Sequence, residues 1–166
     1  MDLLDRLLGH DAWTTARLIE QSRGLTDAQL DQEFDLGWRT VRATLGHIVE
    51  NMEGWTDLMN AQPERTFPEP AERWLTLDVL RERLDTVAPQ LAELAYRIQA
   101  EGRLDELWTF HENPPVSLTY GGTLAHVLTH SMHHRAQLVH MLKRLGVLDV
   151  IEGDVLSWEE EREARA

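Results

Sequence analysis

The sequence contains no cysteine among its 166 residues. This absence excludes disulfide bonds, thiolate metal sites, iron–sulfur clusters and a catalytic thiol supplied by the protein itself. Basic residues are also few, with 16 Lys and Arg against 29 Asp and Glu and a net charge of -13. Because nucleic acids and anionic membranes attract positively charged surfaces, this balance argues against a partner of either kind.

Long apolar runs are absent as well. No stretch approaches the roughly 18 residues that a membrane helix needs, and the first six residues carry acids where a secretory signal has its basic region. We therefore expect a soluble, cytoplasmic protein. The length suits one domain with its own core, and no linker or internal repeat is visible, so we expect a single domain over residues 1–166.

Apolar residues recur at helical spacing in four long stretches, near residues 2–22, 39–61, 77–100 and 121–145. Four amphipathic helices of this length predict an all-α four-helix bundle. Pro89 lies inside the third stretch, and we expect it to kink or split that helix.

The segments between the helices differ in character. Residues 61–73 hold three prolines and are expected to form a loop. Residues 103–120 place aromatic side chains around Asn113-Pro114-Pro115, which predicts a short hairpin or an extended crossover before the last long helix. The acidic tail after Gly153 is expected to be a solvated helix or a frayed end.

Histidine is unusually concentrated in the last long helix. Residues three or four apart stand one above another on a helix, so His130 and His134 can present two imidazoles to one metal ion. Two ligands do not make a tight site, and a third has to come from another helix. The chain has eight histidines, of which five lie in this helix: His126, His130, His133, His134 and His140.

His47 is the favoured third ligand, because it lies in the middle of the second helix beside Gly46, which would allow close approach of another element. Its position is imperfect, since it falls roughly 100° from the apolar seam of its own helix. His10 and His111 are the other candidates. For any one of these residues alone, the simpler interpretation is a partly buried, hydrogen-bonded histidine.

Three roles stay open for His126: a fourth ligand, a residue that positions a ligand, or a packed core residue. His133 and His140 point further from the apolar face, and we expect them to be solvated.

Two segments of the chain resemble a known family. Residues 124–137 contain His130-x3-His134-Arg135-x-Gln137, which is similar to the fourth-helix signature of the DinB-like family of four-helix-bundle metalloproteins. Residues 40–47 match the second-helix motif of that family, followed here by Glu53 and Trp55. One difference is Ala136, where the family usually has glycine; this should change helix packing slightly.

The resemblance implies a bundle with an up-down-down-up course and a long crossover between its second and third helices. It implies a divalent metal, Zn²⁺ or Ni²⁺, bound by His47, His130 and His134 with a coordination position left open. It also implies a homodimer and a low-molecular-weight thiol as cosubstrate. Better-understood relatives transfer such thiols to small electrophilic substrates, or use the thiol to isomerise or open these substrates. A hydrolase-like reaction is a further option.

Two residues could assist such a site. Glu50, one turn from His47, could accept an imidazole N–H, and Arg135 could contact an anionic substrate. The simpler interpretations, a solvated acid and a structural ion pair, are the ones that we favour.

Other functions remain open at this point. The main alternative is a non-catalytic, stress-linked bundle that binds metal as a sensor, store or binding module. A haem bundle with His47 and His130 as axial ligands, and a helical interaction protein with incidental histidines, are further hypotheses.

Overall fold

The computed structural model describes residues 1–63, 65, 75–110 and 114–164, and in this part of the chain most residues are helical. The chain is predominantly helical, as predicted, and it also contains one short two-stranded sheet. The four long helices are α1 (Leu3–Ser22), α3 (Val41–Met59), α4 (Leu77–Ala100) and α5 (Tyr120–Arg144); the short elements are α2 (Asp27–Leu30), β1 (Leu107–Phe110), β2 (Val116–Thr119) and α6 (Val155–Ala164).

Each long helix begins at a side-chain cap. The cap accepts a hydrogen bond from a backbone N–H of the first turn, which would otherwise have no partner. The last helix also ends as expected, with Lys143 and Arg144 in its final turn and Gly146 just beyond it at a φ of +82°. The capping residues are Asp2, Thr40, Thr76 and Thr119.

Pro89 does not split its helix, because α4 continues through it from Leu77 to Ala100. An internal proline costs a helix about 3 kcal/mol. Val87 and Leu91 on either side of it are buried in the core, and each such side chain contributes about 1.5–3 kcal/mol. Burial on both sides is therefore large enough to keep the helix continuous.

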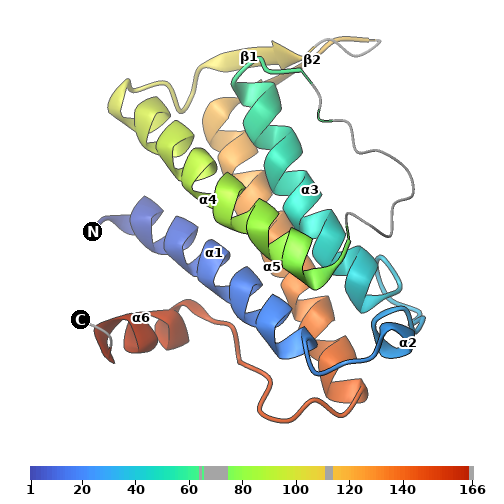
Figure 1. Ribbon diagram of the computed structural model, residues 1–166. Helices are drawn as coiled ribbons and strands as arrows, with labels where there is room; N and C mark the ends of the chain where they lie inside the picture. Colours follow the sequence, from blue (N-terminus) through green and yellow to red (C-terminus); the bar gives the residue numbers. More distant parts are fainter. Residues whose placement is uncertain (64, 66–74, 111–113, 165–166) are drawn as a thin grey trace.

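The four long helices surround one apolar core. α1 and α3 each pack against both α4 and α5, as Figure 1 shows. Leu18, Leu45, Leu84 and Leu138, one from each helix, are fully or almost fully buried in the same cluster. The apolar residues that recur at helical spacing in the sequence thus lie on the helix faces that form the core.

The segment before α5 forms a hairpin, one of the two structures expected there. β1 and β2 pair antiparallel, with Leu107 opposite Thr119 and Phe110 opposite Val116. The sheet is anchored by Trp108, which is buried and donates its indole N–H to Thr123 Oγ1 at 3.1 Å. Asn113 lies outside the described residues.

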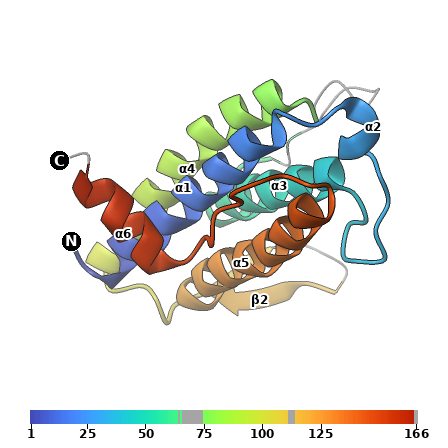
Figure 2. The same ribbon diagram turned by 90° about the horizontal axis from the view of Figure 1, so that it is seen from below.

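The acidic tail forms α6, which packs across the first part of α1 (Figure 2). Its Trp158 is buried against Gly9, where an added Cβ would come within 2.5 Å of the indole ring. Arg6 donates to Glu159 at 2.7 Å. Residues 155–164 of the tail therefore form a helix, one of the two structures expected there, which is only partly solvated because Trp158 packs on Gly9 and Glu159 pairs with Arg6.

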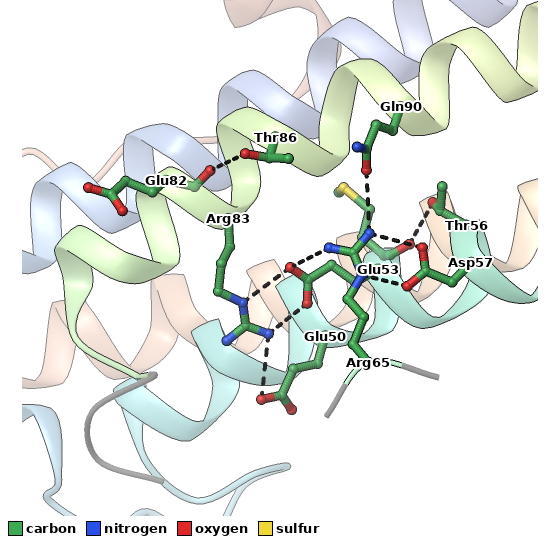
Figure 3. Close-up of polar contacts among 10 residues, drawn as sticks. Glu50, Glu53, Thr56, Asp57, Arg65, Glu82, Arg83, Thr86 and Gln90 are labelled. Atoms are coloured by element: carbon green, nitrogen blue, oxygen red, sulfur yellow. Dashed lines mark hydrogen bonds and ion pairs between the residues drawn. The ribbon is translucent and has the colours of Figure 1, made fainter. Parts of the chain in front are cut away.

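A buried network of charges joins α3 to α4 (Figure 3). Glu53 on α3 is 2% exposed and accepts from Arg83 of α4 at 2.7 Å. Arg65, which follows α3, lies 3.2 Å from Glu53 and also donates to Asp57. The predicted loop at residues 61–73 otherwise lies largely outside the described residues.

None of the helices that the structure describes combines the length and hydropathy needed to span a membrane.

Candidate metal centre

Three histidine side chains converge between α3 and α5. The Nε2 atom of His130 lies 3.3 Å from Nε2 of His47 and 3.3 Å from Nε2 of His134. One nitrogen from each ring falls within 4.8 Å of the others. His130 and His134 stand one turn apart on α5, and His47 reaches them from the middle of α3. The structure thus brings together the three residues that the family resemblance implies.

Hydrogen bonding alone does not account for this convergence. A ring nitrogen carries either one proton or one lone pair, so Nε2 of His130 can satisfy only one of the two nitrogens that it faces. A shared cation can satisfy all three lone pairs at once. Tetrahedral zinc with Zn–N bonds of about 2.0–2.1 Å places its nitrogen ligands about 3.3–3.4 Å apart. The donor set and its spacing therefore fit a divalent metal ion.

The same spacing argues against haem. The Nε2 atoms of His47 and His130 are 3.3 Å apart, which leaves no space for a porphyrin between them. The two rings cannot act as opposite axial ligands in this arrangement, so that alternative is not supported.

Burial keeps two of these imidazoles neutral. It lowers the pKa of His47 to about 4, with repulsion from His134 and His130 adding to the effect. Burial likewise lowers the pKa of His130 to about 4, again with repulsion from its histidine neighbours. A neutral imidazole is the form that binds a metal, so near pH 7 both rings offer a free lone pair.

Gln137 fixes the orientation of the third ring. Its Oε1 accepts from Nδ1–H of His134 at 2.9 Å, which leaves the lone pair of that ring on Nε2, facing the cluster. Its amide group donates to Nε2 of His133 at 2.9 Å. Gly37 makes room for this carboxamide, because a Cβ at Gly37 would overlap Oε1 of Gln137, and the φ of +49° at this position also favours glycine.

Trp38 covers the ring of His47. The two rings stack with centroids 4.3 Å apart and planes 29° apart, while Trp38 itself is 51% exposed. Sequence reasoning missed Gly37 and Trp38, since the segment before α3 has no periodicity that would place it. Gln137 did carry a signal, as the last residue of the motif His-x3-His-Arg-x-Gln.

The remaining histidines lie outside this cluster. His126 is exposed, and its ring lies 5.1 Å from that of His130. His133 and His140 are exposed, as expected. His10 is buried elsewhere and its ring bonds to the carbonyl of Gly153 at 2.8 Å. His111 lies outside the described residues.

The two assisting candidates take other positions. Arg135 is buried and forms an ion pair with Asp11 of α1, so it holds α1 to α5. This is the structural ion pair that was favoured for Arg135 from the sequence. Glu50 is half exposed and lies 3.8 Å from Arg83. Burial raises the pKa of Glu50.

Gly46 allows the close approach of a neighbour, as expected, but this neighbour does not lie in a helix. A Cβ at this position would come within 2.5 Å of a methyl group of Leu75, the residue that precedes the cap of α4. The missing side chain next to His47 therefore admits Leu75.

Comparison with known proteins places the chain in a family. No curated protein matches it. The model of the DinB family matches residues 1–163, nearly the whole chain. This match confirms the resemblance carried by residues 40–47 and 124–137. The chain therefore belongs to the DinB family.

Proposed function

We propose that the protein is a divalent-metal-dependent enzyme in which His47, His130 and His134 hold Zn²⁺ or Ni²⁺. The observation that carries the proposal is the convergence of three imidazoles, in which Nε2 of His130 lies 3.3 Å from Nε2 of both His47 and His134 and all three ligand nitrogens fall within 4.8 Å. Three protein ligands leave a coordination position for a substrate, which is the usual arrangement in catalytic zinc sites. Such a cation supplies Lewis-acid chemistry, which favours the thiolate form of a thiol cosubstrate.

The reaction that we propose is transfer of a low-molecular-weight thiol to a small electrophile, or isomerisation of that electrophile with the thiol. The chain has no cysteine, so the attacking sulfur has to come from a cosubstrate. The protein's own residues orient the site: Gln137 holds His134, and Trp38 covers His47. The net charge of -13 supports a small-molecule partner over a nucleic acid.

The proposal includes the up-down-down-up course of the family. In its support, α3 and α4 run in the same direction in Figure 1, and α1 and α5 run in the opposite one. A single domain over residues 1–166, a homodimer and a cytoplasmic location belong to the same proposal.

Metal content is the first test. We expect the wild type, purified and reconstituted with Zn²⁺, to hold about one ion per chain by elemental analysis, and His47→Ala and His134→Ala to lose most of it. His140→Ala is the matched control, because His140 is exposed on the same helix as His134. Full zinc content in His47→Ala and His134→Ala would contradict the proposed ligands.

Turnover is the second test. A thiol-consumption screen with small electrophiles should show activity in the zinc-loaded wild type and none in His47→Ala. A protein that binds zinc through the same three histidines, yet consumes no thiol with any electrophile, would favour the alternative of a non-catalytic, stress-linked metal-binding bundle.

A further inference from the structure

An open cavity of about 350 Å³ lies next to the three histidines. It is formed by α3, β2 and the first turns of α5, and one of its walls is His126. The His126 ring is 5.1 Å from the ring of His130. The cavity therefore begins about one helical turn, roughly 5.4 Å, along α5 from the nearest candidate ligand. Its lining residues are Trp55, Leu118, Thr119, Gly122, Thr123 and His126.

The walls of this cavity are mainly apolar and aromatic. Trp55 packs edge-on against His126, with ring centroids 5.5 Å apart, and against Phe110 at 5.9 Å. The two threonine hydroxyls are already engaged. Thr119 accepts from the backbone of α5, and Thr123 donates to a backbone carbonyl and accepts from an indole. Such a lining fits an apolar or aromatic group better than a polar one.

The volume is sufficient for a group of that kind. An apolar protein cavity of about 150 Å³ is large enough to bind benzene. The present cavity of about 350 Å³ is larger than this, so it can take a phenyl-sized group, and its wall residue His126 lies beside the candidate ligand His130.

Along α3, Asn51 separates the residue that faces the histidines from the residue that lines the cavity. Asn51 lies one turn after His47 and one turn before Trp55 on α3, and its Oδ1 is buried without a hydrogen-bond partner in the part of the chain that the structure describes. His47 contacts His130 while Trp55 contacts His126, so residue 51 lies between these two contacts.

We propose that this cavity is a substrate subsite that binds an aromatic or similarly sized apolar group of the molecule held at the three histidines. The substrate class is then a small molecule whose reacting atom and apolar group are separated by about one helical turn. This inference rests on the proposed function, because the histidines provide the other attachment point.

The test compares two thiols that differ only in a phenyl group. The dissociation constants of 3-phenylpropane-1-thiol and propane-1-thiol are measured on the zinc-loaded protein by calorimetry. We expect the phenyl compound to bind at least tenfold more tightly. Leu118→Trp fills the cavity, so it should bring this ratio close to one and leave propane-1-thiol unchanged. Leu107→Trp is the matched control, because Leu107 lies on the paired strand and is 64% exposed.

The metal-free protein separates this inference from the proposed function. Binding of 3-phenylpropan-1-ol, followed by nuclear magnetic resonance signals of the Leu118 methyl groups, requires the cavity and neither the metal nor a thiol. Binding of this alcohol without any binding of propane-1-thiol would overturn the thiol chemistry and support the cavity. A ratio close to one in the wild type, or no binding of the alcohol, would overturn the subsite, whether or not Leu118→Trp folds.

Discussion

Gln137 links two histidines of α5 that have different roles. It accepts from His134, inside the cluster, and donates to His133, which is exposed. Because one carboxamide makes both bonds, its oxygen faces His134 and its nitrogen faces His133. Gln137 therefore determines which nitrogen of the buried His134 ring carries the proton, although Gln137 itself does not contact the three converging nitrogens.

We predict that Gln137→Leu weakens zinc binding by about 10–100-fold, the usual cost of losing a partner that orients a metal ligand. Gln137→Glu should lose less, because a carboxylate still accepts from Nδ1–H of His134. Zinc affinity is measured by competition with a chelator, and far-ultraviolet circular dichroism checks that both variants are folded. Equal affinities in the wild type and Gln137→Leu would show that Gln137 does not orient the ligand.

Gly37 and Gly146 form a matched pair for testing the space around Gln137. Both have positive φ values, so alanine should cost each about 1 kcal/mol of stability. At Gly37 the new Cβ would also overlap Gln137, whereas nothing lies within 4 Å at Gly146. We predict that Gly37→Ala weakens zinc binding and Gly146→Ala does not, although urea denaturation should show both to be less stable. Unchanged zinc affinity in Gly37→Ala would mean that the carboxamide of Gln137 can be displaced without weakening zinc binding.

The candidate ligands could be predicted from the sequence to different degrees. His130 and His134 are fixed relative to each other by one helix, so their spacing predicts that they can share an ion. His47 depends on how α3 packs against α5. Its place in the second helix beside Gly46 made it the favoured third ligand, with His10 and His111 as the other candidates, and the family resemblance implied it as well. Trp38 could not be predicted, because its contact with His47 depends on the irregular segment before α3.

Among the elements, the long helices were the most predictable part of the fold. Their limits are encoded locally, by capping side chains such as Thr40 and Thr119 and by apolar spacing. The position of α6 and the continuity of α4 depend on distant contacts instead. Trp158 packs on Gly9, almost the whole chain away, and the core residues around Pro89 come from several helices.

The charge network of Figure 3 gives a prediction about the contact between α3 and α4. Glu53 is buried between Arg83 and Arg65, so Glu53→Ala leaves two guanidinium groups without this acid. Loss of one partner of a buried pair costs about 3–5 kcal/mol, and we expect the lower end because Asp57 still faces Arg65. The matched control is Glu33→Ala, since the Glu33–Arg39 pair is exposed and should contribute about 1 kcal/mol or less.

Urea denaturation of the two variants measures this difference. The midpoint should fall clearly for Glu53→Ala and hardly for Glu33→Ala. Similar small losses in both would mean that the buried carboxylate is as replaceable as an exposed one, and that apolar packing alone holds α3 against α4.

At the scale of the whole molecule, the three histidines link stability to pH and to metal. In the unfolded chain a histidine has a pKa of about 6.5, whereas in the folded, metal-free protein the pKa values of His47 and His130 are about 4. Between these values the unfolded state binds more protons than the folded state. The contribution of both residues is therefore fully present above about pH 6.5 and is lost as the pH falls toward 4.

The acid sensitivity of the metal-free protein should accordingly depend on the cluster. We predict that, in chelator, the urea midpoint of the wild type falls between pH 7 and pH 5 more steeply than that of His130→Gln. Burial also lowers the pKa of His10, so the variant should retain part of the slope. His140→Gln, changed at an exposed position of the same helix, should follow the wild type. Zinc should raise the midpoint most near pH 7, because it binds the folded state and needs neutral imidazoles. Parallel curves for the wild type and His130→Gln would show that the cluster does not couple folding to protons.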